Sequence, residues 1–337
     1  MDLGVVLSEP GRVALEEIVV DEPQAGEVLV RIEATGVCHT DLHVVEEDGW
    51  GHQLPVLLGH EGAGVVEQVG EGVASVAHGD RVVIGWKTAC GECAPCLRGN
   101  PRYCRKPPGA PGRLHRADGA DLMPVLRTGT FATRTVVPAI AVAKVPTLAP
   151  EEACLLGCAV ATGVMSVIET AQIWPGARVA VIGCGAVGLS VIQGAKIAGA
   201  SEIRAIDLDE RKLEQARRFG ATDVGTGPAD FAFDVVARKA TFELALSLAP
   251  TVIQIGLSPA GETAEVMLPS LFARRARILV SHGGDHLPED FPWLAELAMN
   301  GKLDLAGMVT RVAPLAEWSE AFDAMRSGDV IRTVLTP

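Results

Sequence analysis

The sequence predicts an α/β protein of about two domains, one of them built on an open, doubly wound parallel sheet. The chain has 337 residues, about twice the usual length of one domain. Residues 178–207 consist of a short apolar strand, a glycine-rich turn, a segment with helical spacing and a second strand. This alternation of strand and helix is typical of a parallel sheet.

The glycine-rich turn between these strands has the spacing of a dinucleotide site. Gly183, Gly185 and Gly188 form G-x-G-x-x-G where the strand meets the helix. The first glycine permits a tight turn, the second lets a pyrophosphate approach the backbone, and the third lets helix and strand pack closely. The helix N-terminus then offers unpaired N–H groups to the phosphates. We therefore predict a Rossmann domain here, against the alternative of a glycine-rich turn without function.

The end of the second strand indicates which dinucleotide binds. Asp207 stands there, where a carboxylate can bind both hydroxyls of an adenosine ribose. That carboxylate repels a 2′-phosphate, and Asp209 adds to the repulsion. Arg211 and Lys212 are basic and close, so they favour the opposite choice. On balance we expect NAD rather than NADP.

Half of the chain's eight cysteines fall between residues 90 and 104. Cys90, Cys93, Cys96 and Cys104 follow the pattern C-x2-C-x2-C-x7-C, whose short gaps let a turn aim several sulfurs at one point. Four thiolates make a closed tetrahedral zinc site with no position for a substrate. An iron–sulfur or redox centre uses the same ligands, and unliganded buried cysteines are the third alternative. We predict a structural zinc that holds together a lobe of residues 88–106.

Composition limits the partners and the compartment. The formal net charge is −13 and no basic stripe is present, so we expect no nucleic-acid partner. The first residues have no basic stretch followed by an apolar run, and no stretch of eighteen apolar residues occurs, so we expect neither a signal peptide nor a membrane span. We expect a cytoplasmic protein, where thiols stay reduced.

Catalysis at a metal needs a site with an open position, and three further residues could build one. They are Cys38 in "GVCHTDLH", His60 in "LLGHEGAG" and Cys158 in "LLGCAVATG". Two thiolates and one imidazole leave a fourth zinc position free. Taken singly, each cysteine is more often a small buried hydrophobe, and a lone histidine is more often a satisfied polar residue. The three gain weight only together.

The order of these segments resembles that of the zinc-dependent alcohol dehydrogenases of the medium-chain dehydrogenase/reductase superfamily. The resemblance covers nearly the whole chain and includes "GTFATRTVV" at 129–137 and "RSGDVIRTVL" at 326–335. It implies a GroES-like, β-rich catalytic domain of residues 1–159 and 282–337. The Rossmann dinucleotide-binding domain, residues 160–281, is inserted between these two parts.

The resemblance also implies a role for each residue that matches a family position. Cys38, His60 and Cys158 become the ligands of a catalytic zinc. Glu61 follows His60, where the family keeps a carboxylate that can approach the metal. Asp41 would accept a hydrogen bond from His60 and fix its tautomer. The chain should then hold two zinc ions, one catalytic and one structural.

Further matched positions concern the proton, the cofactor and the substrate. Thr40 and His43 match a proton relay in which the hydroxyl touches the substrate oxygen and the imidazole lies nearer solvent. The remaining matches are His39 and Arg332 at the cofactor pyrophosphate, Lys212 near the adenosine ribose, and Trp86 in the substrate pocket. We also place Thr162 and Val187 among the cofactor-binding residues.

One departure from the family pattern falls inside the Rossmann domain. Family members place a full helix between the strands that correspond to "ATDVG" and "FDVVA", but here only about "TGPAD" connects them. Parallel strands usually need a crossover of a dozen residues or more. We therefore expect that helix to be missing or the third strand to be rudimentary. The polar segment 114–129 lacks periodicity, so we expect it to be a surface loop.

We expect an oxidoreductase that transfers hydride between a small alcohol, aldehyde or ketone and NAD. The alternatives are a thiol-adduct formaldehyde dehydrogenase, a specialised biosynthetic reductase acting on a conjugated substrate, and a non-enzymatic NAD(H)-binding redox sensor. Retention of Thr40 and His43 argues against reduction of a conjugated C=C bond. We expect a homodimer, with a homotetramer as the alternative.

Overall fold

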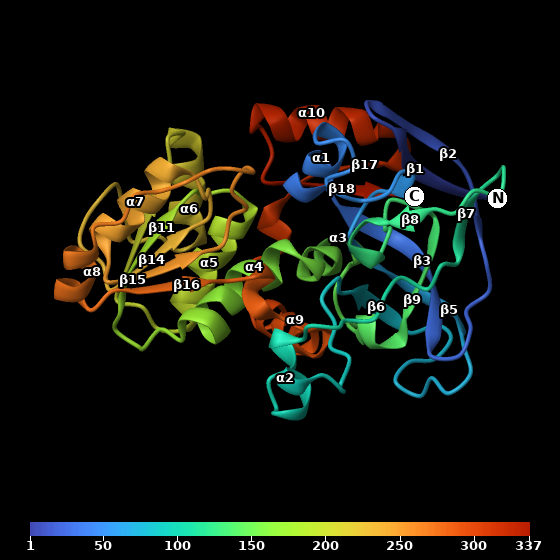
Figure 1. Ribbon diagram of the computed structural model, residues 1–337, viewed down its shortest axis with the longest axis horizontal. Coiled ribbons are helices and arrows are strands. Elements are labelled where there is room, and N and C mark those ends of the chain that lie inside the picture. The colour runs from blue at the N-terminus through green and yellow to red at the C-terminus, as the bar shows by residue number, and fades with distance from the viewer. The chain divides into compact units, whose positions relative to one another are not determined.

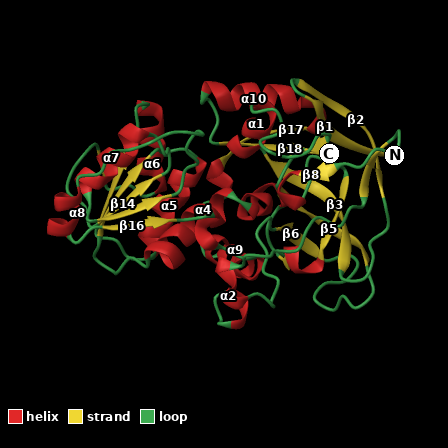
Figure 2. Cartoon of the chain, in the orientation of Figure 1, coloured by secondary structure: helices red, strands yellow, loops and turns green.

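The computed structural model describes residues 1–337, and the chain forms two compact units (Figure 1). Unit 1 comprises Met1–Cys158 and Leu287–Pro337, and unit 2 comprises Ala159–His286. Figure 2 shows that unit 1 is rich in strands, whereas unit 2 surrounds its sheet with helices. No single helix is long and apolar enough to cross a membrane; one pair of consecutive helices with a bend between them passes only when the two are taken together.

Unit 1 contains two sheets. The first has the order β7-β2-β1-β4-β8, and the second has the order β10-β6-β5-β3-β18-β17, with β9 also paired to β3. Neighbouring strands are mostly antiparallel, but β4 pairs with β8 and β17 with β18 in parallel. The strands are β1 (Asp2–Glu9), β2 (Arg12–Val20), β3 (Glu27–Gly36), β4 (Val56–Leu57), β5 (Glu61–Val69), β6 (Arg81–Ile84), β7 (Leu114–Arg116), β8 (Met123–Pro124), β9 (Arg134–Pro138), β10 (Val142–Lys144), β17 (Val309–Pro314) and β18 (Arg332–Thr336).

The α-helices of unit 1 are short. They are α1 (His39–Glu46), α2 (Ala94–Leu97), α3 (Pro150–Ala153), α9 (Phe291–Met299) and α10 (Trp318–Ser327). One core cluster joins β1, α1 and α10 through Val5, Val44 and Phe322. A second cluster contains Val30 of β3, Val66 of β5 and Ile84 of β6. Burial of these apolar side chains holds α1, and the residues it carries, against the sheets.

Unit 2 is a six-stranded sheet in the order β13-β12-β11-β14-β15-β16, and every neighbouring pair is parallel. The strand order reverses between β11 and β14, which is the doubly wound arrangement that the sequence predicted. The strands are β11 (Arg178–Ile182), β12 (Glu202–Ile206), β13 (Asp223–Val224), β14 (Phe231–Asp234), β15 (Thr251–Gln254) and β16 (Arg277–Val280). The helices are α4 (Ala159–Met165), a π-helical turn (Ser166–Ala171), α5 (Ala186–Ile197), α6 (Glu210–Phe219), α7 (Lys239–Leu248) and α8 (Leu268–Arg274).

Helices pack against both faces of this sheet. On one face, Gly188 of α5 lies beside Val181 of β11. On the other face, Ala245 of α7 packs in a cluster with Ala180 and Ile182 of the same strand. Because successive residues of a strand point to opposite faces, the near-continuous apolar sequence of β11 fits a strand that is buried on both sides.

The connection between β13 and β14 contains no helix, as the sequence predicted, and β13 has only two residues. Residues 225–230 cross the sheet as a loop instead. Gly227 lies against the guanidinium of Arg204, where a Cβ atom would come within 2.8 Å of Nε. Arg204 forms ion pairs with Glu202 and Asp223. Arg204, which is paired with two carboxylates, and the loop 225–230 above it thus occupy a surface that the apolar face of a helix would otherwise cover.

The expectation of a surface loop at 114–129 is wrong. Leu114 begins β7, which pairs with β2, and Met123 begins β8, which pairs with β4. Leu114 and Leu122 are each 2% exposed and join the cluster of Val6. The two leucines bury apolar area, which fixes the segment against unit 1 although most residues between them are polar.

Candidate active site and metal centres

The predicted ligands of the catalytic metal come from three separate segments and meet in unit 1. Cys38 precedes α1, His60 precedes β5, and Cys158 follows the short helical turn Cys154–Gly157. The ligand atoms of Cys38, His60, Glu61 and Cys158 all lie within 4.8 Å of one another. Gly59 has a φ of +88°, and a Cβ atom there would come within 2.3 Å of Phe131, so this turn before His60 requires glycine.

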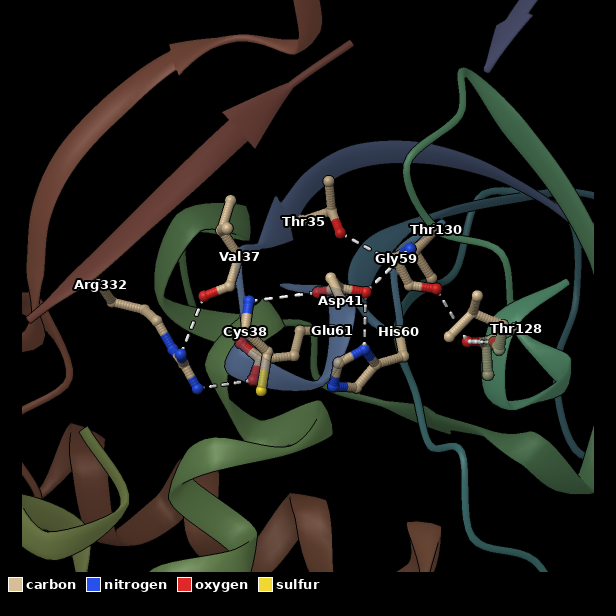
Figure 3. Close-up of polar contacts among 11 residues, drawn as sticks. Thr35, Val37, Cys38, Asp41, Gly59, His60, Glu61, Thr128, Thr130 and Arg332 are labelled. Carbon is tan, nitrogen blue, oxygen red and sulfur yellow. Dashed lines mark hydrogen bonds and ion pairs between the residues drawn. The ribbon is translucent and has the colours of Figure 1, made fainter. Parts of the chain in front are cut away.

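Asp41 orients two members of this cluster (Figure 3). Its Oδ2 accepts a hydrogen bond from the backbone N–H of Cys38 at 3.1 Å, which also closes the first turn of α1. Its Oδ1 accepts from the N–H of Gly59 at 3.1 Å and lies 3.1 Å from Nδ1 of His60. The carboxylate therefore favours the tautomer with hydrogen on Nδ1, and the lone pair of Nε2 points away from it.

The residues present fit a zinc ion. Nε2 of His60 is buried and has no hydrogen-bond partner, although a buried polar atom normally has one. A metal–ligand bond would supply the missing partner, and the sulfurs of Cys38 and Cys158 lie within 4.8 Å of the other ligand atoms of the cluster. Two thiolates and an imidazole are a zinc donor set with a fourth position open.

The electrostatics of the cluster favour a cation. A hydrogen bond from Cys158 holds the pKa of Cys38 well below its usual range, while that contact and burial raise the pKa of Cys158. Burial alone would lower the pKa of His60, but the charges of Asp41 and Cys38 raise it well above its usual value. The same negative groups that attract a proton to His60 attract a divalent cation in its place.

Glu61 lies against a partner that sequence reasoning missed. Nη2 of Arg332 donates to Oε1 of Glu61 at 2.7 Å, and Nη1 donates to the carbonyl of Val37 at 2.8 Å (Figure 3). Both charged side chains are buried, and burial raises the pKa of Glu61 to about 7 against the attraction of Arg332. Nε of Arg332 and Oε2 of Glu61 have no hydrogen-bond partner. The predicted contact of Arg332 with the cofactor pyrophosphate stays a prediction.

The predicted relay residues lie on one helix. Thr40 is in the first turn of α1, and His43 follows one turn later, on the same side. The imidazole of His43 is 36% exposed and stacks on Trp50 with ring centroids 6.2 Å apart. His39 begins α1, and Trp86 follows β6 and is partly buried. Their predicted roles at the cofactor and in the substrate pocket stay predictions.

The four-cysteine lobe has the geometry of a tetrahedral sulfur site. The Sγ–Sγ distances are 3.4 Å for Cys93–Cys96, 3.6 Å for Cys90–Cys104, 3.9 Å for Cys93–Cys104 and 4.0 Å for Cys90–Cys96. A tetrahedral zinc with bonds of about 2.3 Å separates its sulfurs by about 3.8 Å. Backbone N–H groups, foremost that of Arg105, lower the pKa of Cys93 to about 6, which favours a thiolate. The four residues therefore fit a closed zinc site.

The lobe is attached to the rest of unit 1 by an ion pair. Both terminal nitrogens of Arg102 donate to the carboxylate of Asp290, at 2.6 and 2.9 Å. Asp290 immediately precedes α9 and also accepts from the N–H of Leu287. A bidentate pair of this kind adds geometric specificity, so it fixes the orientation of the lobe relative to α9.

The glycine-rich turn of unit 2 fits a dinucleotide. Gly183 has a φ of +93°, and a Cβ atom at Gly188 would come within 1.9 Å of the Gly183 carbonyl oxygen. Gly185 faces open space, which leaves its backbone accessible to a phosphate. The turn leads into α5, where the predicted residue Val187 lies. Thr162 of α4, another predicted residue, is 6% exposed and its hydroxyl has no hydrogen-bond partner.

At the end of β12, Asp207 accepts hydrogen bonds from the N–H groups of Cys184 at 2.8 Å and Asp209 at 3.0 Å. Asp209 caps α6 and forms an ion pair with Arg211, whose Nη2 lies 2.9 Å from Oδ2. Arg211, which sequence reasoning counted as an available cation, is thus already paired. Lys212 follows it on α6.

Comparison with known proteins shows the family. The model for the alcohol dehydrogenase GroES-like domain matches residues 24–147, and the model for zinc-binding dehydrogenases matches residues 186–300. An S-(hydroxymethyl)glutathione dehydrogenase of Escherichia coli O1:K1 is 37% identical over 358 aligned positions, which cover 97% of each chain. The structure of an alcohol dehydrogenase zinc-binding domain protein from Burkholderia ambifaria has a TM-score of 0.93 at 31% identity and covers 99% of this chain and 98% of that one. Benzyl alcohol dehydrogenase from Acinetobacter calcoaceticus has a TM-score of 0.91 at 29% identity, with 100% and 99% covered.

A GroES-like unit and a Rossmann unit in one chain, with two cysteine-rich clusters that could each hold a metal ion, define a zinc-containing dehydrogenase. The chain belongs to the zinc-dependent alcohol dehydrogenase family of the medium-chain dehydrogenase/reductase superfamily. Its class of activity is NAD-linked oxidoreduction of alcohols. The predicted fold class is therefore confirmed, and so is the predicted class of enzyme.

Proposed function

We propose that this chain oxidises a primary alcohol reversibly, with zinc held by Cys38, His60 and Cys158. The observation that supports these ligands most strongly is the buried, unpartnered Nε2 of His60 beside two cysteine sulfurs. Zinc held there supplies a Lewis acid that lowers the pKa of a substrate hydroxyl, and NAD supplies the hydride acceptor. The four-cysteine lobe has no open ligand position, so its zinc is structural.

The protein's own side chains position the site and move the proton. Asp41 holds His60 in one tautomer. The Thr40 hydroxyl accepts the hydrogen bond of the substrate hydroxyl, and His43 passes the proton to water. The imidazole of His43 is partly exposed, and a histidine changes charge near neutral pH, so it suits this step. Arg332 holds the buried Glu61 in place beside the ligands.

The substrate class follows from what the relatives' names have in common. Benzyl alcohol and S-(hydroxymethyl)glutathione each carry a –CH2OH group, on a phenyl ring and on a thiol sulfur respectively. We propose a substrate of the form R–CH2–OH. The second candidate, a hydroxymethyl thiol adduct, is favoured by the relative that is 37% identical over 97% of the chain. Trp86 is the proposed pocket residue.

The choice of NAD over NADP rests on Asp207 and its neighbours. Cys184 and Asp209 hold the carboxylate of Asp207 through their N–H groups, so it stays at the end of β12, where the ribose binds in this fold. Arg211 is paired with Asp209 and does not offer a free charge to a 2′-phosphate.

We further propose a cytoplasmic homodimer. The eight cysteines form no disulfide, which suits a reducing compartment. Strand β16 pairs only with β15, and its residues Ile278 and Val280 are 42% and 66% exposed. An open, apolar strand edge is a template for pairing with another chain. Light scattering coupled to gel filtration distinguishes the dimer from a monomer or a homotetramer.

Absorbance of NADH during incubation with NAD tests the proposed function. One set of reactions contains benzyl alcohol and other primary and secondary alcohols, and another contains formaldehyde with and without glutathione. We expect activity on primary alcohols. Activity with formaldehyde that requires glutathione identifies the thiol adduct as the substrate. Binding of NADH without turnover of any alcohol would instead favour the redox sensor, and reduction of conjugated substrates alone would favour the biosynthetic reductase.

A further inference from the structure

The carboxylate of Glu47 contacts the imidazole of His43, the proposed relay residue. Oε1 of Glu47 lies 2.8 Å from Nδ1 of His43, one helical turn earlier on α1. The backbone N–H of Glu47 also donates to the carbonyl of His43 at 2.9 Å, so the helix end itself fixes where this side chain begins. The Trp50 ring stacks beside the imidazole, with ring centroids 6.2 Å apart. The Glu47 carboxylate is therefore the direct polar partner of the His43 side chain.

The other charged groups near this helix end are engaged elsewhere or lie farther along the chain. Helix α10 packs against α1, and its Arg326 bridges Glu46 at 3.0 Å and Asp323 at 2.8 Å. In the loop after α1, the pKa of His52 is lowered by burial and by Arg127. Asp48 follows Glu47 and has no hydrogen bond to the imidazole. The remaining acid on α10, Glu320, interacts with Arg311 through its backbone carbonyl.

We propose that Glu47 is a positioning residue for proton transfer by His43. This inference rests on the proposed relay. The Glu47 carboxylate accepts a hydrogen bond from Nδ1–H of His43, which leaves the lone pair on Nε2 available. During alcohol oxidation the proton of the substrate hydroxyl is passed to Nε2, and the imidazolium then releases it to water.

Two local effects favour the imidazolium that forms in this step. The first is the negative charge of Glu47. The second is the C-terminal end of α1, since His43 lies in the last turn and a helix C-terminus stabilises positive charge. Glu47 has no such favourable position of its own, because a carboxylate at a helix C-terminus is disfavoured unless it is paired. The contact with His43 supplies that pairing.

Two variants of Glu47 separate the effect of its charge from the effect of its hydrogen bond to His43. Glu47→Gln removes the charge but keeps an oxygen that can accept from Nδ1–H. We expect kcat at the acid end of the profile to rise by about threefold, with the high-pH plateau unchanged. Glu47→Ala removes both, so the plateau should also fall, by about two- to fivefold, the range that exposed pairs span. Because both side chains are partly exposed, these shifts should shrink at high salt.

The experiment measures kcat between pH 5.5 and 9.5 at low salt, with saturating NAD and either benzyl alcohol or S-hydroxymethylglutathione formed from formaldehyde and glutathione. The matched control is Glu46→Gln, which removes the same charge from the adjacent residue, where the partner is Arg326 and not His43. We expect the Glu46→Gln profile to coincide with that of the parent. Thermal unfolding of each variant, followed by circular dichroism, verifies that all are folded.

His43→Gln in the same series separates the two proposals. A loss of turnover that is large near neutral pH and smaller at high pH supports the relay. If that variant behaves so but Glu47→Gln and Glu47→Ala match the parent, the role of Glu47 is refuted and the relay stands. If His43→Gln loses activity equally at every pH, the relay itself is refuted, and the role of Glu47 with it. If Glu46→Gln and Glu47→Gln change the pH profile of kcat equally, the change comes from the general surface charge and not from contact with His43. That result would also refute the proposal.

Discussion

At the scale of single residues, Asp207 is held in place by the protein itself. Its two oxygens accept from the N–H groups of Cys184 and Asp209. Each oxygen keeps a second lone pair, so the carboxylate can still accept from ribose hydroxyls. Asp209 forms an ion pair with Arg211, so this guanidinium is not free to bind a 2′-phosphate.

Asp207→Ser should weaken NAD binding about ten- to hundredfold, since a hydrogen bond to a charged group contributes about 1.5–3 kcal/mol. NADP binding should hold steady, because repulsion is lost but Arg211 remains paired. Adding Asp209→Asn should release Arg211 and raise the affinity for NADP. Titration of both cofactors by protein fluorescence gives the constants. An equal loss for NAD and NADP in the single variant would show that Asp207 acts only on the fold of the turn.

A second residue-scale prediction concerns pH and stability. Arg134 and Thr133 hydrogen-bond Asp2 and hold its pKa below the ordinary value, although burial opposes this. Because the pKa of Asp2 is lower in the folded than in the unfolded chain, ionised Asp2 stabilises the fold. This stabilisation is complete above the pKa of the unfolded chain, near 4, and is lost as the pH falls through the pKa of the folded chain. Asp2→Asn should therefore lower the free energy of unfolding by about 1.5–3 kcal/mol at pH 7.

Urea unfolding at pH 7 and at pH 3 measures the free energy of unfolding of the parent and of Asp2→Asn. The difference between these two free energies should be smaller at pH 3 than at pH 7. The control is Glu9→Gln, at the other end of β1, because Glu9 pairs with Arg12 and both are well exposed. Such exposed pairs contribute about 0–1 kcal/mol. A difference for Asp2→Asn that is as large at pH 3 as at pH 7 would show that packing, and not charge, is responsible.

At the scale of elements, local signals in the sequence identified the strand, turn and helix of the dinucleotide site. The absence of a full helix between β13 and β14 could also be predicted from the sequence, because the connection is too short to contain one. The structure of segment 114–129 could not be predicted in this way. Leu114 is buried where β7 pairs with β2, about 95 residues away in sequence, and Leu122 joins the same apolar cluster; the polar residues between the two leucines hide that pattern.

The three glycines of the turn give an element-scale test. Gly188→Ala should destabilise the protein by about 1–3 kcal/mol, because its Cβ atom would come within 1.9 Å of the Gly183 carbonyl and the backbone must shift. Gly185→Ala should leave stability close to that of the parent, since its side faces open space. It should instead weaken NAD binding by placing a methyl group where the phosphates approach. Thermal unfolding and NAD titration of Gly188→Ala and Gly185→Ala test these expectations. Equal stability of the two variants would contradict the close packing of Gly188 against the Gly183 carbonyl.

At the scale of the whole molecule, the sequence identified candidate ligands but not the contacts that support them. Cys38, His60 and Cys158 stand in recognisable segments, so their meeting could be expected from the family pattern. The ion pair of Arg332 with Glu61 joins residues 271 positions apart, and nothing in either segment indicates it. It follows from the pairing of β18 with β3, which sets the start of β18 beside Val37.

We propose that unit 1 holds two zinc ions, of which only one is catalytic. The decisive measurement determines zinc content and NAD-linked alcohol oxidation on the same preparations of the parent, Cys158→Ser and Cys96→Ser. The parent should hold two zinc ions, and Cys158→Ser should hold about one, fold normally, bind NAD and transfer no hydride. Cys96→Ser should unfold more readily, because a closed zinc site contributes folding free energy. A Cys158→Ser protein that retains activity with one zinc, or an inactive Cys96→Ser protein as stable as the parent, would contradict the assignment of the two sites.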